Sequence, residues 1–140
     1  MERIVSLMTE KNHYLEKFYS LNETELEKFR LGNFETLDYF YQSRERILEI
    51  IKYIDGQFAE SQEANADVQM PEHIKRQCRE AMLIKDQYVE KIIEQDLEVL
   101  SCIEEARNLI IKELQDLKRA KKAVSGYRQP TFGNRIDEEV

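Results

Sequence analysis

The sequence predicts an all-α fold, an antiparallel helical hairpin followed by one long third helix, arranged as an elongated three-helix bundle or coiled coil. Charged residues make up 35% of the 140 residues, with only four glycines and two prolines, which is typical of helices rather than of sheets or disordered chains. Apolar residues recur at steps of three, four and seven, so they line up in stripes on a helix. This length indicates one domain, expected over residues 1–125, followed by a flexible tail over residues 126–140.

The first helix is expected over residues 3–31. Three polar residues, Lys11, Asn22 and Glu25, interrupt its apolar stripe. The simpler interpretation places them at the edge of the stripe with their polar ends in water. The alternative is a buried polar layer that fixes the register of the helices. The apolar stripe consists of Ile4, Leu7, Met8, Tyr14, Leu15, Phe18, Leu21, Leu26 and Phe29.

Gly32 and Asn33 mark the end of the first helix and the start of a second. Glycine suits the left-handed position that follows a helix end, and asparagine is a strong N-cap. Because the connection is so short, the second helix must run antiparallel to the first. Arg44, the charged residue on its inward face, either extends its guanidinium to solvent or pairs with Glu25 or Asp96. The helix is expected over residues 34–60, with inward positions Phe34, Leu37, Tyr41, Leu48, Ile51, Ile54 and Phe58.

A polar connection at residues 59–70 leads to the third helix, expected over residues 71–125. Proline is tolerated in a first helical turn, as at Pro71, and neither proline nor glycine occurs between Glu72 and Ser125. The stripe of this helix consists of Ile74, Cys78, Ala81, Tyr88, Ile92, Val99, Ile103, Ile110, Leu114, Leu117 and Val124.

The third helix is too long for the hairpin to cover. At about 1.5 Å per residue, roughly 27 residues span about 40 Å and roughly 50 residues span about 75 Å. The second half of the stripe is therefore expected to lie exposed, which soluble proteins seldom tolerate unless the surface binds something. The candidate partner-binding residues are Val99, Ile103, Arg107, Ile110, Leu114, Leu117, Lys121 and Val124.

Three arrangements would cover this stripe. The third helix breaks near Ser101 and folds back, two copies pair as a coiled-coil homodimer, or an amphipathic helix of another protein docks there. Residues 106–124 carry a net charge of +4 and the other 121 residues carry −11, so Arg107 and the cluster Lys118–Lys122 would attract acidic residues on such a helix. The alternative explanation for the cluster is favourable placement at a helix C-terminus.

The residues give no support for an enzyme, a metal site or a cofactor site. Glu10 and His13 form one Glu-x-x-His pair, whereas a di-iron bundle needs two such pairs and two further carboxylates. No Gly-rich phosphate loop is present. A net charge of −7 argues against nucleic acid as a partner, and no apolar run is long enough for a membrane span or a signal peptide. We therefore expect a cytoplasmic protein that works by contact with other proteins.

Several local features resemble one known family. Residues 21–54 combine an E-x-x-L run within Glu23–Phe29, the Gly32–Asn33 turn, and the charged pair Arg44–Glu45 before Ile47 and Leu48. The segment Leu117–Tyr127 is basic and ends in tyrosine, and the polar tail closes on acidic residues. In these features, and in its length, acidity and three-helix layout, the chain resembles the small flagellar export chaperones of the FlgN and FliT type.

This resemblance implies a cytoplasmic chaperone that shields the helical terminus of a late flagellar subunit, a hook–filament junction or cap protein. The chaperone would then deliver that client to the export machinery. The resemblance also implies that the C-terminal tail has a regulatory role, because the C-terminal portion of relatives can occlude the client site. The positions of the partner-binding residues follow from periodicity and not from the family. The alternative function is a structural coiled-coil dimer or adaptor protein with no client-holding role.

Overall fold

The computed structural model describes residues 2–139, with side chains described for residues 2–126. The elements are three α-helices, α1 (Glu2–Arg30), α2 (Leu37–Ala64) and α3 (Glu72–Glu139). No strand occurs among these residues, and the predicted all-α class with a long third helix is confirmed. The chain divides into two compact units, Met1–Leu100 and Ser101–Val140, where the sequence predicted one domain over residues 1–125. We call them the bundle unit and the C-terminal unit.

The turn between α1 and α2 has the geometry that its glycine predicted. Gly32 adopts a φ of 78°, which only glycine adopts at little cost. Its N–H donates to the carbonyl of Phe29 at 3.0 Å, and the N–H of Asn33 donates to the carbonyl of Lys28 at 2.9 Å. These two hydrogen bonds form a Schellman motif, which satisfies carbonyls at the end of α1.

α2 begins three residues later than predicted, at Leu37 rather than residue 34. Asn33 is not its N-cap, because the Asn33 side chain accepts a hydrogen bond from the N–H of Glu35 at 3.1 Å and so stabilises a turn before the helix. Thr36 occupies the N-cap position without capping the helix through its side chain. Its hydroxyl instead donates to Glu25 Oε2 at 2.6 Å.

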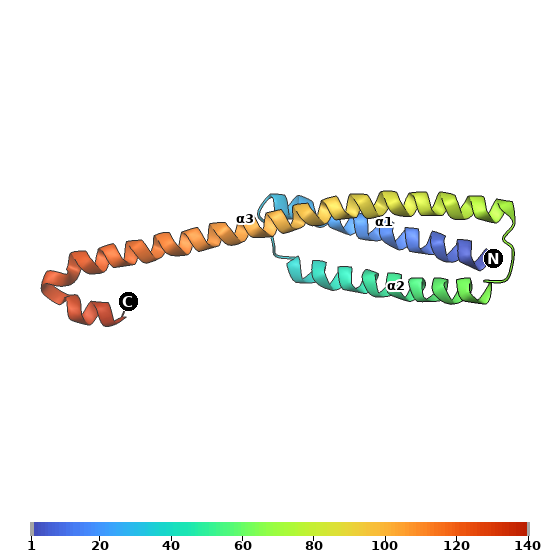
Figure 1. Ribbon diagram of the computed structural model, residues 1–140. Helices are drawn as coiled ribbons and strands as arrows, with labels where there is room; N and C mark the ends of the chain where they lie inside the picture. Colours follow the sequence, from blue (N-terminus) through green and yellow to red (C-terminus); the bar gives the residue numbers. More distant parts are fainter. Residues whose placement is uncertain (1, 140) are drawn as a thin grey trace. The chain divides into compact units, whose positions relative to one another are not determined.

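The contacts between helices give their directions. As the chain advances along α1, the residue numbers of its contacts on α2 decrease, from Lys11–Asp55 to Phe29–Phe40, so these helices are antiparallel. The residue numbers of its contacts on α3 increase in the same direction, from Asn12–Ala81 to Arg30–Glu98, so α1 and α3 are parallel. Figure 1 shows α1, α2 and the first part of α3 side by side, with the N-terminus close to the α2–α3 connection. The predicted hairpin and the predicted direction of the third helix are both confirmed within the bundle unit.

The core of the bundle unit follows the predicted stripes closely on α1 and less closely on α2. Phe40 is completely buried although it was not on the predicted inward face, whereas Tyr41 and Leu48, which were, are exposed. The aromatic ring of Phe40 packs against that of Phe29 with 5.3 Å between ring centroids, which explains its inward position. The buried apolar residues are Ile4, Leu7, Leu15, Phe18, Leu26, Phe29, Phe40, Ile51, Ile54, Ile74, Ala81 and Val99.

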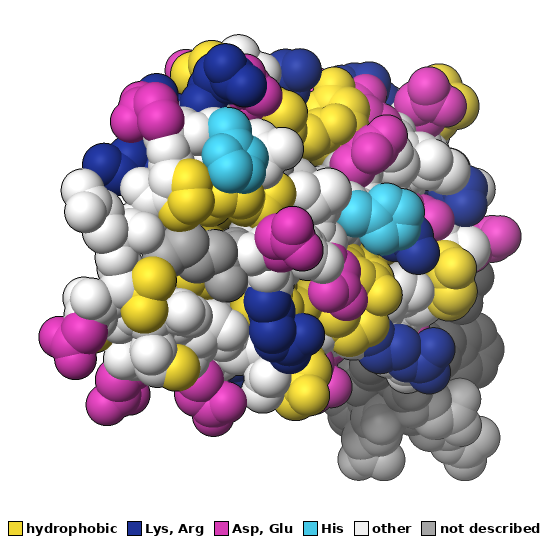
Figure 2. All heavy atoms as spheres, turned by 90° about the vertical axis from the view of Figure 1, so that its right-hand side faces the viewer, with side chains coloured by type: hydrophobic (Ala, Val, Ile, Leu, Met, Phe, Trp, Pro, Cys, Tyr) yellow, Lys and Arg dark blue, Asp and Glu magenta, His cyan; other side chains and the backbone are white. Residues whose placement is uncertain are grey.

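Two adjoining cavities lie toward the end of the bundle that carries the N-terminus, with volumes of about 220 and 280 Å³. Figure 2 shows this end, where apolar side chains lie among acidic, basic and histidine side chains. Met8, Phe58 and Met82 line both cavities. Because methionine is flexible and fills irregular gaps, we regard these cavities as a feature of core packing at the open end of the bundle.

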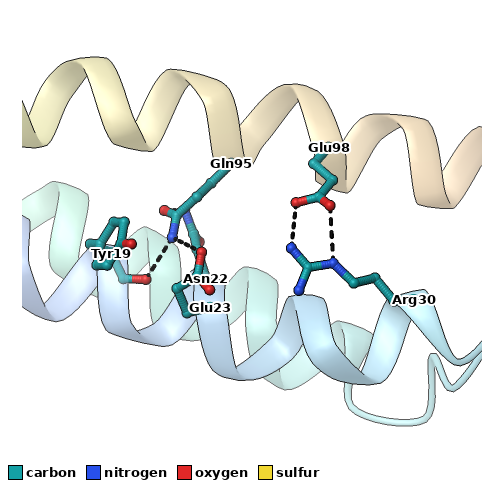
Figure 3. A network of polar contacts seen from close by, with 6 residues as sticks. All are labelled: Tyr19, Asn22, Glu23, Arg30, Gln95 and Glu98. Atoms are coloured by element: carbon teal, nitrogen blue, oxygen red, sulfur yellow. Dashed lines mark hydrogen bonds and ion pairs between the residues drawn. The ribbon is translucent and has the colours of Figure 1, made fainter.

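Of the three polar residues that interrupt the stripe of α1, Asn22 and Glu25 are buried, whereas Lys11 is half-buried and pairs with Asp55. Asn22 is completely buried and Glu25 is 2% exposed, so the expectation that their polar ends reach water is wrong for both. Asn22 Nδ2 donates to Gln95 Oε1 at 3.2 Å. Gln95 Nε2 donates in turn to the carbonyl of Tyr19 at 3.1 Å and to Glu23 Oε1 at 2.8 Å (Figure 3). This network fixes the register of α3 on α1, as the alternative interpretation proposed.

α3 is assigned as one helix from Glu72 to Glu139, so the break considered near Ser101 is not observed. The backbone also remains helical beyond the predicted end at residue 125. Gly126 has no positive φ and no close neighbour, and a glycine inside a helix costs only about 1 kcal/mol relative to alanine. The side chains of residues 127–140, where the sequence predicted a flexible tail, lie outside the described residues.

Candidate partner-binding surface

The predicted binding residues beyond Ser101 share one face of α3. Their spacing alternates between four and three residues without exception, which is the heptad pattern of helices that pack along one seam. We call this surface the seam. It consists of Ile103, Arg107, Ile110, Leu114, Leu117, Lys121 and Val124.

The apolar side chains of the seam are exposed. Ile110 is 55% exposed, Leu114 60% and Leu117 55%, and Val124 is also exposed, while Ile103 is half-buried. Leu109 and Ile111 widen the exposed apolar area on either side of Ile110. They were missed as site residues, although the apolar run 109–111 was a signal that the face is broader than one stripe. Exposed apolar patches of this kind mark interaction surfaces in soluble proteins.

Val99 does not belong to this surface. It is 2% exposed and lies in the bundle unit, so a partner cannot reach its side chain without unfolding the bundle. Val99 shares its helix face with the buried residues Ile74, Ala81 and Gln95. The sequence could not separate Val99 from the seam because periodicity gives the face of a helix, whereas burial depends on what lies opposite that face.

The basic residues in the seam and beside it are exposed. Arg119 forms an ion pair with Asp116 at 3.8 Å, whereas Arg107 and Lys121 form no ion pair with residues 2–126. Placement at a helix C-terminus does not explain the Lys118–Lys122 cluster, because α3 continues to Glu139 and its last turn contains no basic residue. The cluster is therefore a basic surface in the middle of a helix.

The Glu-x-x-His pair of α1 is not part of a metal-binding cluster in the described part of the chain. Glu10 and His13 are exposed, and no group of three His, Cys, Asp or Glu side chains among the described residues could hold a metal ion. Within the same residues, no helix carries an apolar stretch of the length that crossing a membrane requires. The pKa of the Glu98 carboxyl is lowered by hydrogen bonds from the Arg30 guanidinium and by the charge of that guanidinium. That pair is exposed and joins α1 to α3 (Figure 3).

Comparison with protein-family models, with curated proteins and with solved structures gave no match.

Proposed function

We propose that this protein is a chaperone that holds an amphipathic helix of a client protein on the seam of α3. The observation that carries the proposal is the exposure of Ile110, Leu114 and Leu117 on one continuous helix face. A helix with an apolar stripe is the natural complement of such a face, and the docking of helices into apolar surfaces is a recurring mode of recognition. The resemblance supports a late flagellar subunit as the client, a cytoplasmic location, and delivery of the client to the export machinery.

The stabilisation of such a complex comes mainly from apolar burial. At about 25 cal/mol per Å², covering the apolar side chains of the seam is worth on the order of 5–10 kcal/mol before the cost of ordering the client. The same contacts would occupy the client's own assembly surface, so that it remains unassembled until the complex dissociates. Acidic residues on the client would be attracted to the basic cluster, which raises the association rate.

The alternative function is a structural coiled-coil dimer or adaptor. The heptad spacing of the seam favours it, because two copies with this spacing can pair along the same face. Sedimentation at several protein concentrations separates the two functions: a client-holding chaperone stays a monomer until a client helix is added, whereas an adaptor dimerises alone.

The test uses Leu114→Asp and a matched control, Asn108→Asp. Both variants make an exposed position more acidic, and at about 100° per residue Asn108 lies on the helix face opposite the seam. Binding is measured by fluorescence anisotropy with labelled terminal helices of hook–filament junction and cap proteins. We expect Leu114→Asp to weaken binding at least tenfold and Asn108→Asp to leave it unchanged. Equal binding by both variants, or a dimer that survives Leu114→Asp and takes up no client helix, would refute the chaperone function.

A further inference from the structure

The seam contains two cationic layers at regular positions. One step of four residues and one step of three make a heptad, so each heptad of the seam has two core positions. The first core position is always apolar, and its residues are Ile103, Ile110, Leu117 and Val124. The other core position alternates between types, with Arg107, Leu114 and Lys121. Arg107 and Lys121 are 14 residues apart, about 21 Å along a helix at about 1.5 Å per residue.

A helix that covers the seam would displace much of the hydration water of Arg107 and Lys121. A charged side chain at a core position of a coiled coil lowers stability, and a buried charge is tolerated when an opposite charge and hydrogen bonds compensate it. Both side chains are exposed and lack ion pairs within residues 2–126. Any helix that covers the seam therefore has to neutralise these two layers or lose affinity.

A second copy of this chain does not neutralise them. A parallel pair in register sets Arg107 against Arg107 and Lys121 against Lys121. An antiparallel pair with Ile110 opposite Leu114 sets Arg107 against Leu117 and Lys121 against Ile103, with no opposite charge in either layer. The seam is thus poorly suited to pairing with itself, although its spacing is that of a coiled coil.

We propose that the helix bound by the seam carries two acidic residues 14 positions apart within an otherwise apolar heptad stripe, one opposite Arg107 and one opposite Lys121. The proposal rests on the proposed function and specifies the chemistry of the client. Lys118 and Lys122 lie next to the second layer and reinforce its preference for a carboxylate. The separation of the two acidic residues is the same for a parallel and an antiparallel client, so the orientation of the client does not alter the required spacing.

The experiment uses three helical peptides that share the same apolar heptads and differ only in two layers 14 residues apart. These layers carry glutamate, glutamine or lysine, and each peptide is used at a concentration at which sedimentation shows it to be monomeric. The full-length protein is compared with Arg107→Glu/Lys121→Glu and with Arg76→Glu/Lys112→Glu. The second variant changes the net charge equally at exposed positions away from the seam.

We expect the wild-type protein to bind the glutamate peptide at least tenfold more tightly than the glutamine peptide, and the lysine peptide most weakly, because like charges brought together in an interface are strongly unfavourable. Arg107→Glu/Lys121→Glu should reverse this order, and Arg76→Glu/Lys112→Glu should keep it. Equal affinity for all three peptides would overturn the inference but leave the proposed function standing. If no peptide binds, the inference fails as well, and the Leu114→Asp experiment with client helices decides separately whether the proposed function fails with it.

Discussion

Arg44 of α2 and Asp96 of α3 form an ion pair, with 3.0 Å between Nη2 and Oδ2. The guanidinium of Arg44 also lies over the rings of Phe18 and Phe40, at 5.0 Å from each centroid. Asp96 accepts a further hydrogen bond from Asn22 Nδ2 at 3.4 Å. Of the two partners considered for Arg44 from the sequence, Asp96 is confirmed. Residues of all three helices thus meet around one half-buried guanidinium.

Arg44→Ala is expected to lower the free energy of unfolding by about 1–3 kcal/mol, because it removes the cation–π contacts and leaves a partly buried carboxylate without its cation. Urea denaturation followed by circular dichroism measures this change. The control is Arg79→Ala, since Arg79 and its partner Glu72 are both exposed. That variant should change stability by less than about 0.5 kcal/mol. Equal effects from the two variants would show that Arg44 acts as an ordinary surface residue.

Thr36→Val is expected to destabilise the protein by about 1–3 kcal/mol, because it removes a hydrogen bond to the buried carboxylate of Glu25. The buried Glu25 carboxylate accepts hydrogen bonds from the Thr36 hydroxyl at 2.6 Å and from Lys28 Nζ at 3.2 Å. Valine keeps the shape of threonine and removes the donor, so a buried acceptor is left underbonded. Thr36→Ser keeps the hydroxyl and should retain most of the stability. Loss of the same size in both variants would mean that the methyl group of Thr36, and not its hydroxyl, is what matters.

The fold was largely predictable because its determinants are local. The left-handed Gly32 and the short connection after it are enough to give an antiparallel hairpin. The buried state of Asn22 and Glu25 was not predictable, since it depends on Gln95 and Thr36 arriving opposite them from other helices. The sequence pattern around a polar residue in an apolar stripe is the same whether its side chain is exposed to water or buried against a hydrogen-bond partner.

The helix face that carries the candidate site was predictable, but the extent of its exposed surface along and around the helix was not. Val99 and Leu114 both belong to the apolar stripe that the sequence predicted for the third helix, yet one is 2% and the other 60% exposed. The apolar stripe continues along α3 while the side chains facing it change. Leu109 and Ile111 lie off the main stripe, and their exposure depends on how far packing extends around the helix.

Val99→Ala should lower the stability of the protein without weakening client binding. Leu114→Ala should weaken client binding without lowering the stability. Val99→Ala removes buried apolar volume and should lower the free energy of unfolding by about 1–3 kcal/mol. Leu114→Ala should change it by less than about 0.5 kcal/mol, because the side chain is exposed. In the anisotropy assay only Leu114→Ala should weaken client binding. A destabilised Leu114→Ala variant would indicate that Leu114 is part of the folded core.

Glu98→Gln removes the Arg30–Glu98 ion pair, and the resulting loss of stability should depend on pH. Arg30 Nε and Nη2 donate to the two oxygens of Glu98 at 3.0 and 2.7 Å, and these bonds lower the pKa of Glu98. A lowered pKa in the folded state gives stabilisation that is present at neutral pH and is lost as the pH falls through that pKa. The urea midpoint of wild type should exceed that of Glu98→Gln slightly at neutral pH, and the difference should vanish in acid. A difference that grows in acid would contradict this sign.

The most direct test of the central claim is methyl NMR of the full-length protein during titration with the terminal helix of a flagellar cap protein. The seam offers Ile103, Ile110 and Leu114 as reporters, and the core of the bundle unit offers Ile54 and Ile74. We predict that the methyl signals of the seam shift or broaden as the helix is added, while those of Ile54 and Ile74 stay in place. Perturbation confined to the bundle core, with the seam signals unmoved at saturating peptide, would contradict the assignment of the seam as the client-binding surface.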